Sequence, residues 1–152
     1  MIPLIEKKIM KKLRFINQLL NIDNKYVDDG SDFILFKKSE IIQIFNELNF
    51  SCKYLKGGGY LIERKYEKYT FQCDFVISRN TIGVYYILLK EGKLIDTRIS
   101  NIHFLLNYLP YDNEMINVNF RLNSLSDLKS YINDHVILFN QFIDEYIKEI
   151  TY

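Results

Sequence analysis

Four side chains in this sequence could serve as nucleophiles or zinc ligands: the two histidines, His103 and His135, and the two cysteines, Cys52 and Cys73. Neither histidine has a second His, Cys or Glu at the spacing of a metal motif. The cysteines match no metal or redox spacing, and we expect both to be reduced and unpaired. We interpret the histidines as ordinary surface or half-buried residues and Cys73 as a buried, inert thiol. The sequence thus predicts no catalytic residue, no metal site and no cofactor.

Three further patterns could bind phosphate, bind a cation or act as acids. Gly57-Gly58-Gly59 lacks the lysine and hydroxyl residue of a phosphate loop and precedes a strand, so we predict a hairpin turn. Residues 28–32 (DDGSD) lack the acid that closes a calcium loop, which favours a solvated loop. Glu63, Asp74 and Asp96 could form a paired acid site on one sheet face, although exposed strand positions are commonly charged.

The middle of the chain alternates between apolar and polar residues, and turn signals of two or three residues interrupt this alternation. Spacing of this kind is typical of β-hairpins. It predicts five strands, near residues 51–56, 60–66, 69–78, 81–90 and 93–99.

The turns fix a register, and the register can be checked against side-chain character. It pairs Ile77 with Ile82, Phe75 with Val84, and Cys73 with Tyr86. Most of the apolar strand residues then share one face, and a slip of one residue would scatter them over both. The fourth strand also carries Tyr85, Ile87 and Leu89 on its other side, which predicts a central or doubly covered strand.

Helical periodicity flanks these strands on both sides. We predict helices over residues 3–21, over 40–49 with Ser39 as N-cap, over 101–109, and from the Ser124 cap to about residue 150, with a further strand at 118–122. The fold class is therefore α+β: one domain over residues 1–152, with an antiparallel meander sheet of five to six strands. N-terminal helices and a long C-terminal helix pack on this sheet.

Composition and charge exclude several classes of function. The chain is 48% hydrophobic and 26% charged with a net charge of +1, so no overall field recruits nucleic acid or an anionic membrane. No apolar run approaches the roughly 20 residues of a membrane span, and we expect a cytoplasmic protein. Residues 1–25 are basic and residues 126–152 acidic, which favours two adjacent terminal helices over a basic face for a partner.

These observations favour a non-enzymatic module that binds a protein partner, such as a toxin-neutralising immunity protein. Small size and abundant sheet tyrosines support this hypothesis, as does a composition typical of an AT-rich bacterial genome. The alternative is a small-molecule-binding or hydrolytic domain that uses polar groups on the second sheet face. The oligomeric state is left open. We predict a partner-binding surface on that second face, made of Glu63, Asp74, Tyr85, Ile87, Asp96 and Arg98.

Overall fold

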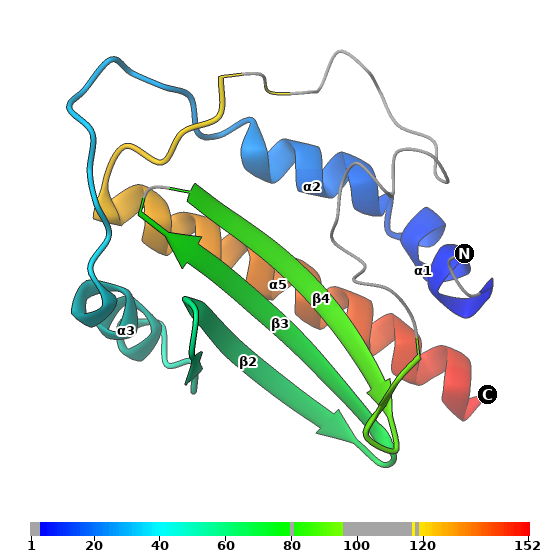
Figure 1. Ribbon diagram of the computed structural model, residues 1–152. Helices are drawn as coiled ribbons and strands as arrows, with labels where there is room; N and C mark the ends of the chain where they lie inside the picture. Colours follow the sequence, from blue (N-terminus) through cyan, green and yellow to red (C-terminus); the bar gives the residue numbers. More distant parts are fainter. Residues whose placement is uncertain (1–3, 80, 96–116, 118) are drawn as a thin grey trace.

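The computed structural model describes residues 4–79, 81–95, 117 and 119–152 of the chain. The described elements are α1 (Leu4–Lys12), α2 (Phe15–Asp23), α3 (Lys38–Glu47), β1 (Lys53–Leu55), β2 (Gly59–Tyr66), β3 (Tyr69–Ser78), β4 (Thr81–Lys90), β5 (Lys93–Leu94) and α5 (Leu125–Thr151). All four described helices lie on one side of the sheet, where α5 crosses it between α1 and α2 on one flank and α3 on the other (Figure 1). The predicted α+β fold with a long C-terminal helix is confirmed.

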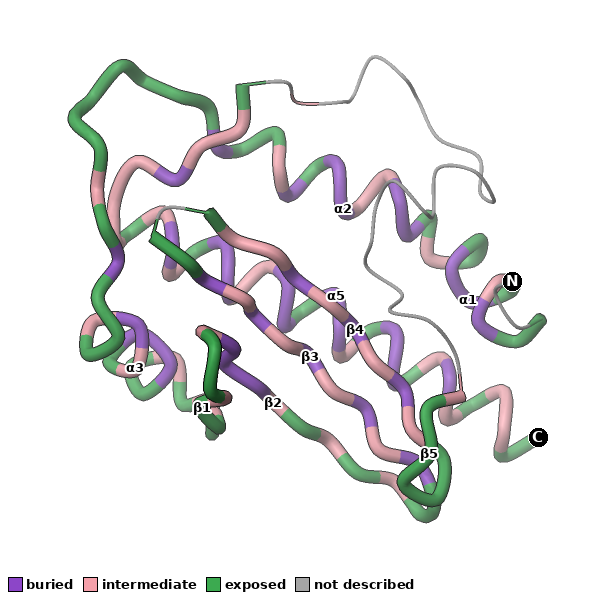
Figure 2. Tube along the Cα trace, viewed as in Figure 1, coloured by how far each residue is buried: buried purple, intermediate pink, exposed green. Residues whose placement is uncertain are grey.

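The sheet is an antiparallel meander in which the strands follow one another in the order β1-β2-β3-β4-β5. The predicted register is confirmed, because Ile77 faces Ile82, Phe75 faces Val84 and Cys73 faces Tyr86. Along β3, buried and half-buried residues alternate as a sheet with one covered face requires. Figure 2 shows this alternation along the long central strands.

Strand β1 is shorter than the sequence predicts, and only the beginning of the predicted fifth strand falls within the described residues. β1 pairs with β2 over three residues, and β5 pairs with β4 only through Leu94 and Lys93. The backbone N–H of Ile95 still donates to the carbonyl of Leu88 at 3.1 Å. The remainder of the fifth strand and the helix at 101–109 fall outside the described residues. In place of the sixth strand, the described residues near 120 form an isolated bridge between Val27 and Phe120.

The single helix predicted for residues 3–21 is wrong, because the chain breaks into α1 and α2 at Arg14. Arg14 has a left-handed backbone with φ of 50°, which interrupts the helical hydrogen-bond pattern. The side-chain amide of Gln18 compensates by donating to the free carbonyl of Leu13 at 2.6 Å. The apolar periodicity continues across the break, and for this reason the sequence pattern does not reveal it. Both helices contact α5, and Phe15 just after the break is fully buried.

The helix starts are set by local caps. Helix α3 begins at Lys38, before the predicted Ser39 cap, because the Glu40 carboxylate accepts the backbone N–H of Lys37 at 3.2 Å. Helix α5 has the predicted cap, in which the Ser124 hydroxyl accepts the N–H of Asp127 at 3.0 Å. The Asp127 carboxylate accepts the N–H of Asn123, one residue before the position that a capping box uses.

Helix α5 organises the core because it buries two sides. One side packs on the sheet, and another packs on α1 and α2. Its largest buried residues include Phe139, Phe142 and Tyr146. Across 27 residues the helix is about 40 Å long, so it spans the whole sheet. Among the described residues, none of the helices combines the length and the apolar character that a membrane span requires.

Ion pairs join the basic N-terminal segment to the acidic C-terminal helix, as the charge distribution predicts. Lys8 pairs with Glu149 at 2.9 Å, Lys12 pairs with Glu145, and Lys25 pairs with Asp134 at 3.0 Å. Each lysine is more than half exposed, so each pair contributes roughly 0–1 kcal/mol. The pairs therefore align the helices, while the buried apolar residues hold them together.

Candidate functional site

The second face of the sheet, on the side away from the helices, is built from side chains in transverse rows. Strand register places them in four rows: Gly59, Val76 and Gly83; Leu61, Asp74 and Tyr85; Glu63, Gln72 and Ile87; and Lys65, Thr70, Leu89 and Leu94. The apolar members run along β4, beside the middle strand β3, and charged members lie mainly on β2. The result is an aliphatic and aromatic strip with a charged flank.

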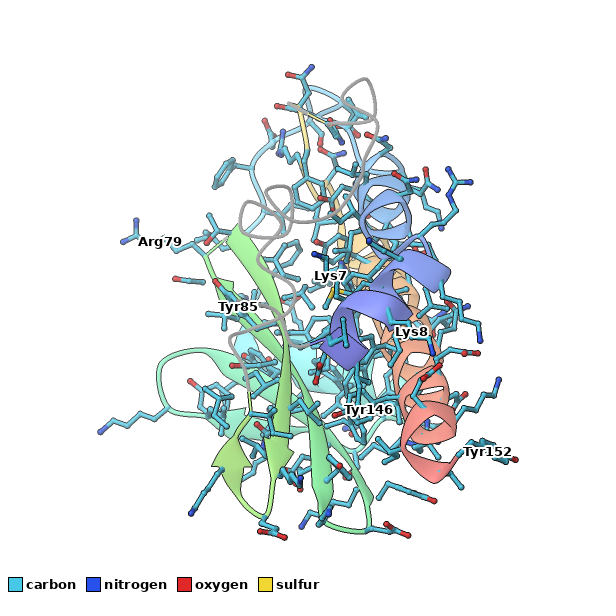
Figure 3. All side chains as sticks on the ribbon, turned by 90° about the vertical axis from the view of Figure 1, so that its right-hand side faces the viewer. Lys7, Lys8, Arg79, Tyr85, Tyr146 and Tyr152 are labelled. Atoms are coloured by element: carbon cyan, nitrogen blue, oxygen red, sulfur yellow. The ribbon has the colours of Figure 1, made fainter. Side chains whose placement is uncertain are left out.

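Two glycines in the first row make room for larger neighbours. A Cβ atom at Gly83 would lie 3.1 Å from the ring of Tyr85, so this ring extends over the glycine. A Cβ atom at Gly59 would lie 2.9 Å from the carboxylate of Asp74. Figure 3 shows Tyr85 on the side of the sheet away from the helices and Tyr146 on the helix side. The glycines thus set where Tyr85 and Asp74 lie.

The structure brings together four of the six predicted partner-binding residues. Tyr85, Ile87 and Asp74 are half-buried, and Glu63 is exposed. No described helix covers them (Figure 1). Asp96 and Arg98 lie outside the described residues.

The predicted paired acids are not directly opposed. Glu63 faces Gln72 across the strands, and its carboxylate accepts the Gln72 amide at 2.7 Å. Asp74 lies in the next row, opposite Leu61 and Tyr85. The position of Glu63 is therefore that of a hydrogen-bonded surface acid.

A buried polar pair, Tyr86 and His135, connects the sheet to α5. The Tyr86 hydroxyl donates its single proton to the backbone carbonyl of His135 at 2.9 Å and lies 3.1 Å from the His135 Nδ1. With its single proton given to the carbonyl, the hydroxyl accepts from Nδ1–H, so we assign the proton of the imidazole to Nδ1. Nε2 has no hydrogen-bond partner among the described residues. Burial lowers the pKa of His135 to about 3.

The interpretation of His135 as a surface or half-buried residue is wrong, because it is only 3% exposed. The spacing of apolar residues places His135 beside the side of α5 that packs on the sheet. This spacing does not show that another side of α5 is also buried. His103 lies outside the described residues.

A second polar group adjoins this pair where α2 meets α5. The Tyr131 hydroxyl donates to the Asp23 carboxylate at 3.2 Å, and the Tyr131 ring lies 4.6 Å from that of His135. Burial raises the pKa of Asp23 to about 6, and the hydrogen bond from Tyr131 opposes this shift. Burial and then the charge of Asp134 raise the pKa of Tyr26 to about 12. These polar side chains are packed within the fold.

Both cysteines are free, and neither has a nucleophile's environment. Cys73 is fully buried, and burial followed by the charge of Asp74 raises its pKa well above the ordinary value. Burial also raises the pKa of the half-buried Cys52. A reactive thiol requires the opposite shift. Arg64, which could have been a cationic neighbour, pairs with Asp144 at 2.9 Å instead.

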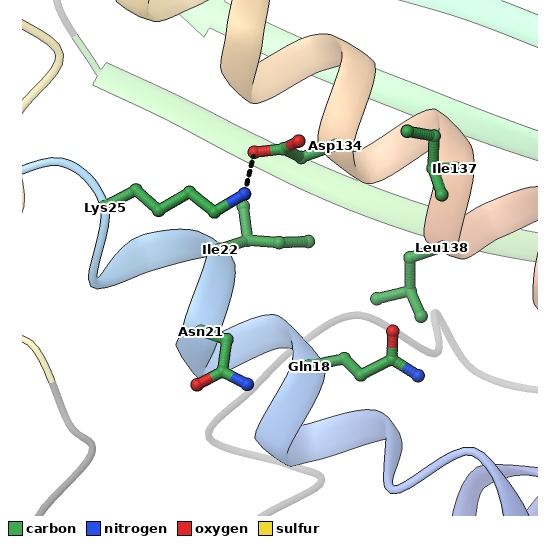
Figure 4. A pocket seen from close by; sticks show the side chains of 7 residues that line it. All are labelled: Gln18, Asn21, Ile22, Lys25, Asp134, Ile137 and Leu138. Atoms are coloured by element: carbon green, nitrogen blue, oxygen red, sulfur yellow. Dashed lines mark hydrogen bonds and ion pairs between the residues drawn. The ribbon is translucent and has the colours of Figure 1, made fainter.

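Two shallow pockets lie between helices, and the sequence did not indicate either. One, of about 200 Å³, lies between α2 and α5, and the ion pair of Lys25 with Asp134 closes one end (Figure 4). The other, of about 290 Å³, lies between α3 and the start of α5, beside the pair of Lys129 with Glu47. The complementary charges of the N-terminal and C-terminal segments could have indicated the first pocket, because they predict that these segments are neighbours. The charged groups in both pockets already have partners, and this leaves little chemistry for a ligand.

The glycine-rich and acidic segments have the structures that the sequence predicts. Gly57 and Gly58 have positive φ in the turn between β1 and β2. In the acidic loop, Asp28 pairs with Arg121 at 2.8 Å and accepts the N–H of Gly30. Within the described ranges, no three His, Cys, Asp or Glu side chains converge to hold a metal ion.

The fold and site thus define an α+β protein with an antiparallel meander, one helix-covered face and one amphipathic face. A scan against protein-family models finds no match. Searches of curated proteins and of solved structures find no significant similarity either.

Proposed function

We propose that this chain is a non-enzymatic protein-binding module whose partner docks on the second face of the sheet. The observation that carries the proposal is the composition of this face: half-buried Tyr85, Ile87 and Leu89 form an apolar strip, and exposed Glu63 and Lys65 lie at its flank. An aromatic and aliphatic centre with a charged rim is the composition of a protein interface.

We further propose that the partner is a toxin domain that this chain neutralises in the bacterial cytoplasm. The chain's small size supports this part of the proposal, as does an amino-acid composition typical of an AT-rich bacterial genome. A rigid sheet supports it as well, because a pre-organised surface loses little conformational freedom on binding. Long antiparallel pairing between β2, β3 and β4 supplies this rigidity.

Affinity capture from the source organism followed by mass spectrometry tests the proposal. The wild-type chain is compared with Ile87→Lys, which places a charge in the centre of the proposed interface. The matched control is Ile137→Lys, because Ile137 is 50% exposed on α5. Circular dichroism and a thermal melt establish that both variants fold.

We expect wild type and the Ile137 variant to capture the same protein, and the Ile87 variant to lose it. If that protein arrests growth when expressed alone, co-expression with wild type should restore growth and co-expression with Ile87→Lys should not. Equal capture by all three chains would refute the proposed surface. A captured protein with no effect on growth would refute the toxin assignment and leave the surface standing.

A further inference from the structure

The segment that joins α2 to α3 carries an exposed apolar ridge. In this connecting segment, residues 31–37, Phe33 is 64% exposed and Leu35 is 60% exposed. Their neighbour Ile34 is half-buried, and Phe36 is buried. Alternation with a period of two is that of an extended strand, so Phe33 and Leu35 point outward together.

One edge of this segment is hydrogen-bonded within the chain, and the other edge is open with respect to the described residues. The N–H of Phe36 donates to the carbonyl of Arg79 at 3.3 Å, and the carbonyl of Asp32 accepts from the Arg121 guanidinium at 2.8 Å. In an extended strand, the backbone groups of successive residues point to opposite edges. Those of Phe33 and Leu35 therefore point away from the fold, where no described residue bonds to them.

Charges at the two ends of the segment are opposite in sign. Asp29 lies just before the segment, Asp32 lies at its start and Lys37 lies at its end. None of these three forms an ion pair within the described part of the chain. The neighbouring charges are already engaged, because Asp28 pairs with Arg121 and Lys38 lies 3.8 Å from the ring centre of Tyr54.

This order of charges indicates that a second copy of the chain could bind at the open edge. Edge strands that avoid pairing often carry charges of one sign, which repel a second copy. Here an antiparallel second copy would place its basic end against the acidic end of the first. The same contacts would occur twice around a two-fold axis, as a closed symmetric dimer requires.

We propose that a second copy of this chain pairs antiparallel with the connecting segment. The two-fold axis passes at Ile34, so Phe33 of each copy lies opposite Leu35 of the other, and both exchange backbone hydrogen bonds. Lys37 of each copy approaches the acidic end of its neighbour. The interface is small, which makes the dimer weak and dependent on concentration. The surface is separate from the second sheet face, so each proposal can fail without the other.

Charge exchange between two variants tests this pairing by analytical ultracentrifugation over a wide concentration range. Asp32→Lys replaces the acid nearest the apolar ridge with a base, and Lys37→Asp makes both ends of the segment acidic. Asp is also a favourable N-cap, so Lys37→Asp should preserve α3. Phe33→Ser removes part of the apolar ridge without opening the core. Lys56→Asp changes an exposed lysine in the turn before β2 and is the matched control.

We expect wild type and the Lys56 variant to associate reversibly. Each charge variant alone should have a dimer dissociation constant at least about tenfold higher than that of wild type. Mixing Asp32→Lys with Lys37→Asp should restore association as a mixed dimer, and Phe33→Ser should abolish association. A wild-type chain that stays monomeric at every concentration would overturn the proposal. A dimer that tolerates all three segment variants would do so as well, since it would use another surface.

Discussion

Burial of His135 should make an acid-sensitive contribution to stability, and replacing His135 should remove that contribution. Burial lowers the pKa of His135 from 6.5 to about 3, so below pH 6.5 the unfolded chain binds a proton that the folded chain excludes. Stability is therefore lost as the pH falls from 6.5 towards 3. Each pH unit in this window costs about 1.4 kcal/mol for one proton, and the loss between pH 7 and pH 4.5 sums to about 2.5 kcal/mol.

Asp23, which belongs to the adjoining polar group, should act in the opposite direction. Burial raises its pKa from 3.8 to about 6, so in this interval the folded chain binds a proton that the unfolded chain lacks. Its contribution to the free energy of unfolding rises as the pH falls from 6 to 3.8. The increase between pH 7 and pH 4.5 is about 2 kcal/mol. The two groups therefore nearly cancel in the wild-type protein, and single variants are needed to separate them.

The substitution His135→Asn removes the titration and retains a polar group near the position of Nδ1. At pH 7 the variant should be less stable, since it loses ring packing against Tyr131 and Phe75. Relative to wild type it should recover about 2.5 kcal/mol at pH 4.5. Asp23→Asn, whose amide oxygen can still accept from Tyr131, should behave in reverse and lose about 2 kcal/mol relative to wild type over the same range.

Urea denaturation of the three chains at a series of pH values between 7 and 4.5 measures these differences. Comparing each variant with wild type cancels the contributions of other titrating groups. Examples are Glu145, whose pKa is lowered by hydrogen bonds from Lys12 and Lys148, and Asp28, whose pKa is lowered by the Gly30 N–H and then by Arg121. If the free energies of unfolding of His135→Asn and wild type stay parallel across this range, His135 is not excluded from protonation by burial. That result would refute the buried, neutral state of its imidazole.

Three further predictions concern the sheet and the thiols. Phe75→Ala should lower the free energy of unfolding by about 3–5 kcal/mol, because Phe75 is fully buried; a melting temperature shifted by only a degree or two would contradict this. Thiol titration of unreduced, denatured protein should find Cys52 and Cys73 both free, and recovering none would overturn the cysteine assignment. Glu91→Asn should stabilise the β4–β5 turn by about 0.5–1 kcal/mol in chemical denaturation, because Glu91 has φ of 52° and Asn tolerates this conformation; a destabilised variant would contradict that explanation.

The sequence by itself determined the sheet and the long helix because each depends on local signals. Short turns placed consecutive strands side by side, and a period of two then allowed one register with a continuous apolar face. This is why the pairing of Phe75 with Val84 follows from the sequence alone. The Ser124 cap and the helical period that follows it determined α5 in the same way. The charges of the terminal segments also indicated that these helices are neighbours.

Tertiary structure alone decided the features that depend on contacts between distant elements. The break at Arg14 leaves the apolar period unchanged, so only the packing of α1 and α2 on α5 reveals it. Burial of His135 depends on α5 being covered on two sides, and its hydrogen bonds require Tyr86 on a strand far away in sequence. Exposure of Phe33 and Leu35 has the same origin, because an apolar residue in a short extended segment is buried or exposed according to what packs over it. Periodicity records which residues share a face, whereas only the assembled fold decides which faces are covered.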